Sequence, residues 1–319
     1  MKNQPFRYLV ILIVVCGCST TARQDSPETQ VTEKYTGPII DMHIHAYDQE
    51  AGSTMFGVDY TNPLTGDKFK GVNGPEEQKI ETLKILERNN IVKAMTSDGE
   101  LWYDVDPDRI IISGRNVSAD SLRERHNQSQ LHAIGEIVSF YGGLKADDAS
   151  LTPYFDLAEE LNIPIGYHIF PGGPPGGIYY MGLKSVRAAN SNPMQIEEVL
   201  VDHPKIKIYL AHGGWPYLED MKALMYAHPQ LYIELGGISW ILPTNELHNY
   251  LKGLFDSGFG NRIMFGTDQM VWPSTIEKAI EGINAADFLS LEQKENIFYN
   301  NAASFLGLSN EEIKKHKSQ

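Results

Sequence analysis

Six side chains with metal-binding chemistry stand at or near the ends of apolar, strand-like runs of the sequence. Imidazole and carboxylate groups bind zinc and related divalent cations, and a site built from them can keep one position open for water. We therefore expect an enzyme with a metal centre. The six candidates are His43, His45, Glu136, His168, His212 and Asp268.

The first two candidates form a His-x-His pair. In a strand, residues i and i+2 point to the same side about 6.6 Å apart, so both imidazoles can reach one ion. The chain has 10 histidines in 319 residues, which gives about 0.3 such pairs by chance and makes the motif weak alone. Its position after the apolar Ile39 and Ile40 adds weight, because a parallel barrel carries its active face at the carboxyl ends of its strands.

His168 and His212 each end an apolar run, and Gly213 and Gly214 follow the second histidine. Glycine lets the backbone turn sharply, so such a histidine can project into a barrel mouth. Taken singly, each could instead be a hydrogen-bonded core histidine. Taken with the His-x-His pair, both are predicted to be metal ligands.

The two carboxylates have different signals. Asp268 follows the apolar run 262–267, where it can bind an ion and accept a proton from water. A helix-capping role fits poorly, because Pro273 lies several residues further on. Glu136 lies inside an apolar run, where an ionised group needs a partner. That partner is a second metal, a lysine, or a metal-ligating histidine.

The pattern around these residues predicts an α/β fold. Short runs rich in Ile, Val, Leu and Tyr alternate with segments of helical spacing, as in βαβ units. Eight runs are found, and eight parallel strands close a (β/α)8 TIM barrel. The predicted strands are 38–43, 91–96, 109–113, 132–138, 163–169, 206–212, 231–235 and 262–267.

The barrel is expected to be a single domain over residues 37–308, followed by a polar tail at 309–319. The connection 46–75 after the first strand is unusually long and glycine-rich. A loop of that length in a compact domain is usually functional, so we expect a lid over the barrel mouth, with a surface insertion as the alternative.

The first residues are predicted to be a targeting segment. Lys2 and Arg7 precede a short apolar run, too short to cross a bilayer, and the sequence 15–18 resembles the lipobox of bacterial lipoproteins. That resemblance implies a signal peptide at 1–17, lipidation of Cys18, a flexible tether at 18–36 and anchoring in the cell envelope, with Ser19 typical of the outer membrane. A plain secretion signal is the alternative.

The net charge of −14 argues against nucleic acid as a partner, because phosphates require a basic face and no basic stripe is present. We expect a small-molecule substrate instead. Aromatic and basic residues on the loops that follow the strands suit a partly apolar organic molecule with a carboxylate. The candidate substrate contacts are Arg115, Tyr179, Tyr180, Trp215 and Trp272.

The order Asp-x-His-x-His, Gly-Glu, His, His, Asp on successive strands resembles the amidohydrolase superfamily of metal-dependent TIM barrels, and the stretch 192–236 is similar to its amidohydrolase-related branch. The resemblance implies one or two divalent ions, best matched by zinc. His43, His45 and Asp268 would bind the first, His168 and His212 the second, and Glu136 would bridge. Relatives with a carboxylated lysine at the bridge have Lys where this chain has Glu.

These observations predict a hydrolase that attacks a small ester, lactone or amide with a metal-bound hydroxide. Asp268 would move the proton, and His212 or Tyr167 would steady the oxyanion. Two alternatives stay open: a non-oxidative decarboxylase of an aromatic or unsaturated acid, and a catalytically silent lipoprotein that binds a metal or an envelope ligand.

Overall fold

The computed structural model describes residues 33–318, except for residues 116, 174 and 181 and the side chain of Tyr180. The described residues belong to one compact unit. The predicted signal peptide, Cys18 and nearly all of the predicted tether lie outside the described residues. Among the residues that are described, no helix has the length and apolarity needed to cross a membrane.

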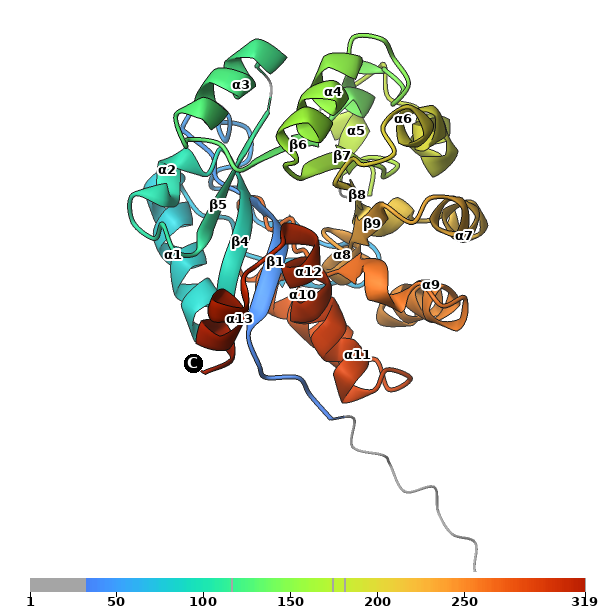
Figure 1. Ribbon diagram of the computed structural model, residues 1–319. Helices are drawn as coiled ribbons and strands as arrows, with labels where there is room; N and C mark the ends of the chain where they lie inside the picture. Colours follow the sequence, from blue (N-terminus) through green and yellow to red (C-terminus); the bar gives the residue numbers. More distant parts are fainter. Residues whose placement is uncertain (1–32, 116, 174, 181, 319) are drawn as a thin grey trace, which may run out of the picture. The chain divides into compact units, whose positions relative to one another are not determined.

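Eight parallel strands surround a common axis, which confirms the predicted TIM barrel (Figure 1). Each strand pairs with the next barrel strand along the chain, and the backbone N–H groups of Met42 and Asp268 close the ring by donating to Phe265 and His43. The strands are β1 (Ile39–His45), β4 (Ile91–Ser97), β5 (Ile110–Gly114), β6 (Ala133–Ile137), β7 (Ile165–His168), β8 (Ile208–Ala211), β9 (Leu231–Glu234) and β10 (Ile263–Met264).

Helices cover the outside of the barrel (Figure 1). The longest of them, α1 and α9, follow β1 and β9 in the chain. The α-helices are α1 (Pro75–Arg88), α2 (Glu100–Tyr103), α3 (Ala119–Asn127), α4 (Thr152–Leu161), α5 (Gly177–Tyr180), α6 (Glu197–Asp202), α7 (Leu218–Ala227), α8 (Ile238–Ile241), α9 (Thr244–Asp256), α10 (Thr275–Asn284), α11 (Leu291–Glu295), α12 (Asn301–Leu306) and α13 (Asn310–Lys317).

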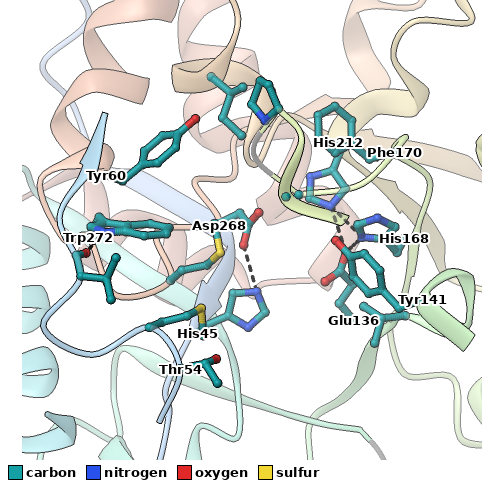
Figure 2. A pocket seen from close by; sticks show the side chains of 18 of the residues that line it. His45, Thr54, Tyr60, Glu136, Tyr141, His168, Phe170, His212, Asp268 and Trp272 are labelled. Carbon is teal, nitrogen blue, oxygen red and sulfur yellow. Dashed lines mark hydrogen bonds and ion pairs between the residues drawn. The ribbon is translucent and has the colours of Figure 1, made fainter. Parts of the chain in front are cut away.

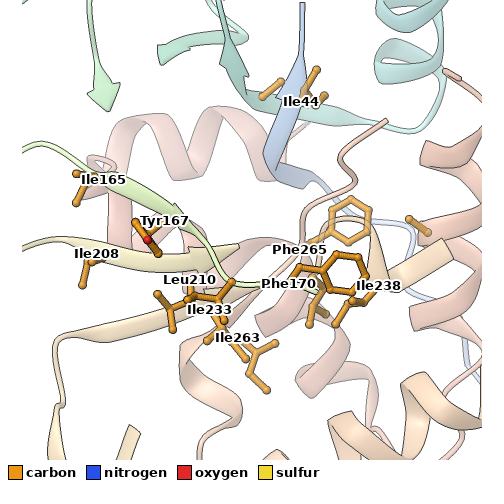
Figure 3. Packing of buried hydrophobic residues seen from close by; sticks show 14 of the residues in the cluster. Ile44, Ile165, Tyr167, Phe170, Ile208, Leu210, Ile233, Ile238, Ile263 and Phe265 are labelled. Atoms are coloured by element: carbon orange, nitrogen blue, oxygen red, sulfur yellow. The ribbon is translucent and has the colours of Figure 1, made fainter. Parts of the chain in front are cut away.

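The strands are buried on both faces, which explains why they are continuous apolar runs rather than alternating ones. Ile165 pairs with Ile208 across β7 and β8, and Leu210 pairs with Ile233 across β8 and β9. Figure 3 shows these side chains in the packed core. The site residues are thus carried on a rigid framework.

The connection after β1 is more ordered than a loop without periodicity would suggest. It contains a two-stranded hairpin of β2 (Tyr60–Thr61) and β3 (Lys68–Phe69). Its Asn62 is fully buried and donates to the Ile241 carbonyl at 2.8 Å, and Trp272 Nε1 donates to the Val58 carbonyl at 2.8 Å. The segment is therefore fastened to the loops beyond β9 and β10.

The opposite end of the barrel holds the start of the described chain. Tyr35 N donates to the Asn284 side chain at 2.8 Å, and the buried Lys294 ammonium donates to the carbonyls of Glu33 and Asn284, both at 2.9 Å. The segment expected as a polar tail is instead helix α13, which begins with a Ser309 capping box. Its His316 is buried and bonds the Tyr299 hydroxyl at 2.9 Å.

Candidate metal centre

The fold brings all six predicted ligands to the carboxyl end of the barrel (Figure 2 shows five of them). His43 and His45 both lie within β1, which runs two residues further than predicted. Glu136 is on β6 and His168 ends β7, whereas His212 and Asp268 occupy the turns just beyond β8 and β10. All six are 9% exposed or less.

His43, His45 and Asp268 form the first cluster. The two Nε2 atoms are 3.1 Å apart, and Asp268 Oδ1 lies 3.0 Å from His45 Nε2 and 3.8 Å from His43 Nε2. Ligands bound at about 2.1 Å to one ion are separated from each other by roughly 3.0–3.7 Å. The three atoms therefore have the spacing of ligands around a shared cation.

Glu136, His168 and His212 form the second cluster. Glu136 Oε1 lies 2.6 Å from His168 Nδ1 and 3.0 Å from His212 Nε2, and the two nitrogens are 3.0 Å apart. The other carboxylate oxygen, Oε2, lies 3.4 Å from His43 Nε2 in the first cluster. One carboxylate thus faces both clusters, as a bridging ligand must.

Hydrogen bonds fix the tautomers of two of these histidines. His212 Nδ1 lies 2.8 Å from the Gly236 carbonyl, which only accepts, so Nδ1 carries a proton and Nε2 of the neutral ring offers a lone pair to the cluster. His43 Nδ1 lies 2.9 Å from Glu234 Oε1, which orients that ring in the same way. Both rings are arranged to donate electrons through Nε2.

The charge balance of the centre favours a cation. Glu136, Glu234 and Asp268 are three buried carboxylates, and within the described chain none of them pairs with a lysine or arginine. Buried anions are stable only when they are paired or coordinate a metal. The donor set and the gathering of three buried carboxylates without a lysine or arginine partner both fit a divalent ion.

The pKa shifts follow from this crowding. Burial raises the pKa of the Glu136 carboxyl, but the His168 and His43 imidazoles outweigh burial and hold that pKa well below its ordinary value. Asp268 behaves in the same way: burial acts upward, while His43 and His45 lower its pKa overall. Both acids are therefore ionised near neutral pH and can bind a cation or accept a proton.

Unusual backbone conformations direct two of the ligands. His212 and Asp268 adopt φ values of +63° and +52°, in the left-handed region that side chains seldom occupy. Such strain persists where the surrounding structure enforces it, typically at functional sites. Behind Glu136, a Cβ on Gly135 would approach the Gly166 carbonyl oxygen to 2.6 Å, so only glycine allows β6 and β7 to lie this close.

The centre lies at the base of a cavity of about 680 Å³ whose walls are mainly apolar. Met55 and Val58 of the connection after β1 line the cavity, and Figure 2 shows Thr54 and Tyr60 of the same connection on the side opposite the second cluster. A cavity of this size suits a small organic molecule. Further lining residues are Tyr47, Thr54, Asp59, Arg115, Val138, Tyr141, Phe170, Ile241, Met270 and Trp272.

Two of the predicted substrate contacts line this cavity. Trp272 packs 5.2 Å from Tyr60 between ring centroids, and Arg115 is held by Asp98, whose Oδ2 lies 3.3 Å from Nη2. Arg115 is the one cationic side chain among the described lining residues. It can therefore receive an anionic group of a bound molecule.

Two other predicted contacts, Tyr179 and Trp215, do not line the cavity. Tyr179 is 83% exposed, because its short helix α5 turns the ring to solvent. Trp215 packs on Phe170 at 5.9 Å and donates to Glu246, so it lies behind the wall rather than on it. The side chain of Tyr180 lies outside the described residues. Tyr167, which was considered for the oxyanion, is buried. Its hydroxyl lies 2.7 Å from the Ser139 hydroxyl, and its side chain does not line the cavity.

Sequence reasoning missed Glu234 and Tyr47, and it gave Asp41 no role beyond its place in the Asp-x-His-x-His motif. Glu234 ends β9 and contacts both clusters. The Tyr47 ring stacks on His45 at 5.4 Å, whereas Asp41 binds the Thr267 hydroxyl and supports the loop that carries Asp268. Glu234 had the same signal as Glu136, an acidic residue inside an apolar strand.

Comparison with known proteins agrees with this geometry. The family model described as Amidohydrolase matches residues 40–308, and the chain therefore belongs to that family. Membership of this family, together with clusters of His, Glu and Asp side chains that could hold a metal ion, supports an enzyme.

Individual relatives are distant. Protein fluG of Emericella nidulans is 21% identical over 95 residues, which are 30% of this chain and 11% of that protein's length. A probable 2-pyrone-4,6-dicarboxylic acid hydrolase from Acinetobacter baumannii has a TM-score of 0.59 at 13% identity, covering 85% of this chain and 99% of its own. A 5-carboxyvanillate decarboxylase from Sphingomonas paucimobilis has a TM-score of 0.56 at 15% identity, and the match covers 85% of this chain and 99% of the decarboxylase chain. At these identities the likeness concerns the fold.

Proposed function

We propose that the protein is a metal-dependent hydrolase of a small ester, lactone or amide. The observation that carries the proposal is the pair of ligand clusters joined by Glu136 at the base of a largely apolar cavity. Zinc suits the mixture of imidazole and carboxylate donors. When bound, the ion would polarise a carbonyl and lower the pKa of water toward 7.

The residues of the chain have separable roles in this reaction. Asp268 is ionised, lines the cavity and lies 3.0 Å from His45, so it can take a proton from the attacking water and return it to the leaving group. His212 also lines the cavity, where it can steady charge on the substrate oxygen. Arg115 would hold an acidic group, and the walls around Trp272 would exclude water from the apolar part.

The test begins with protein stripped by a chelator and reloaded with Zn²⁺ or Mn²⁺. Lactones and carboxylic esters are then screened by proton release, and N-acyl amides by release of the free amine, with the stripped protein as control. We expect turnover only after metal loading. Tight metal binding without turnover of any of these classes would refute the hydrolase and favour a metal-binding protein without catalysis.

A second candidate is non-oxidative decarboxylation of an aromatic or unsaturated acid. Arg115 favours it, because a guanidinium in an otherwise apolar cavity suits a carboxylate, and a decarboxylase is among the structures of similar fold. Release of CO₂ from hydroxybenzoates by metal-loaded protein, without hydrolysis of any ester or lactone, would select this function.

We also propose that the protein is exported and held in the cell envelope by a lipid on Cys18. The support is the sequence pattern at 15–18. Metabolic labelling with a fatty acid, compared between the natural chain and Cys18→Ala, tests the proposal. Absence of label in the natural chain would contradict it.

A further inference from the structure

Glu234 makes hydrogen bonds toward both ligand clusters. Its carboxylate is fully buried at the end of β9. Oε1 lies 2.9 Å from His43 Nδ1 and accepts from the backbone N–H of His212 at 3.0 Å, while Oε2 accepts from the backbone N–H of Gly236 at 2.5 Å. One side chain therefore contacts a ligand of the first cluster and the backbone of a ligand of the second.

The contact with Gly236 extends this influence to the His212 ring. Gly236 is held by Glu234 through its N–H and accepts from His212 Nδ1 through its carbonyl at 2.8 Å. The carboxylate thus orients the imidazole of His43 directly and that of His212 through one glycine. In both rings the result is the same, since Nε2 is left free to face the cluster.

The surroundings are shaped to admit this carboxylate. A Cβ on Gly236 would lie 2.7 Å from Glu234 Oε2 and 2.9 Å from His43 Nδ1, and a Cβ on Gly266 would overlap Oε2. The groups that converge on the two oxygens are N–H donors, so the site needs a group that only accepts. An amide in place of the carboxylate would turn its NH₂ toward one of these donors.

We infer that Glu234 is a positioning residue that presets both metal positions at once. The inference rests on the metal centre proposed above. This positioning role differs from a packing role in one testable respect. A side chain of the same shape that offers one hydrogen-bond acceptor fewer should bind metal more weakly. Loss of the partner that orients a metal-bound histidine lowers metal affinity by about 10–100-fold.

The experiment measures Zn²⁺ affinity by competition with a chelator in the full chain and in Glu234→Gln. Glu277→Gln, in an exposed pair with Arg88, is the control and should bind like the unaltered chain. We expect Glu234→Gln to lose about 10–100-fold in affinity for both ions and to change the absorption spectrum of the Co²⁺-loaded protein. Affinity within twofold of the unaltered chain would overturn the inference.

Two further arms keep the test decisive. If Glu234→Gln is insoluble, Glu234→Asp replaces it, because its shorter carboxylate cannot reach His43 Nδ1, and unchanged affinity there overturns the inference equally. If the unaltered chain itself binds no ion, the proposed metal centre fails and this inference fails with it. If the unaltered chain and Glu234→Gln bind metal equally well, the role of Glu234 is refuted and the proposed metal centre still stands.

Discussion

Glu136 Oε2 lies 3.4 Å from His43 Nε2, although the two residues are on strands separated by β4 and β5 in the barrel. Because the other oxygen of Glu136 contacts the second cluster, this carboxylate joins the two groups of candidate ligands. The number of bound ions should therefore depend on it.

Replacement of Glu136 by glutamine should reduce bound metal from two equivalents to one or fewer. The amide keeps the shape but loses the charge that faces both clusters, and activity should fall by about 10–100-fold or more. Elemental analysis of metal-loaded protein measures the stoichiometry. A natural chain that binds a single equivalent at saturation would contradict the bridging role.

Replacement of Asp268 by asparagine should lower kcat by about 100- to 10,000-fold, the usual contribution of a proton-transfer group. The rate is compared at saturating metal, with ion content verified for each sample, so that loss of a ligand is not mistaken for loss of the base. Asp256→Asn, in an exposed pair with Lys252, serves as control. Undiminished kcat in Asp268→Asn would remove Asp268 from the mechanism.

Replacement of Asn62 by alanine should loosen the cavity wall. The change leaves the Ile241 carbonyl without its buried donor, at a cost of about 1–3 kcal/mol in stability. Hydrogen exchange in residues 57–72 should accelerate, and KM should rise more than kcat falls. Asn73→Ala lies in the same connection but affects only an exposed contact with Glu77, so it is the matched control.

His316 should make stability depend on pH. Burial lowers the pKa of His316 below its ordinary value of 6.5, with help from Lys93 and Lys315 and against Glu312 and Asp108. The unfolded chain then binds the proton more readily than the folded chain. The contribution of His316 to the free energy of unfolding is therefore fully present above about pH 6.5 and is lost as the pH falls below that value. The stability advantage of the natural chain over His316→Gln should shrink on acidification, as measured by denaturant unfolding. A constant difference from pH 8 to pH 5 would contradict the shift.

The barrel and most of its candidate ligands were predictable because these side chains stand at or near the ends of apolar runs, and parallel strands bring their carboxyl ends to the same rim. His168 and His212 could thus be placed together across 44 residues of sequence. Glu234 was missed although Leu231–Glu234 is also an apolar run that ends in a carboxylate. Its importance depends on His43 and Gly236, which only the fold brings near.

The loops were predicted less well for a physical reason. Residue type on a loop does not fix its direction, so Arg115 and Trp272 line the cavity whereas Tyr179 faces solvent. The order of the connection after β1 was also invisible, because Asn62 acts through backbone carbonyls beyond β9. Contacts with the main chain leave no trace in sequence periodicity.

The clamp of Lys294 and Asn284 on the chain around Glu33 and Tyr35 secures the point where the polypeptide enters the barrel. That point is at the amino ends of the strands, while the cavity opens at their carboxyl ends. A label or solid support attached at Glu33 itself would therefore lie at the end of the barrel opposite the cavity mouth.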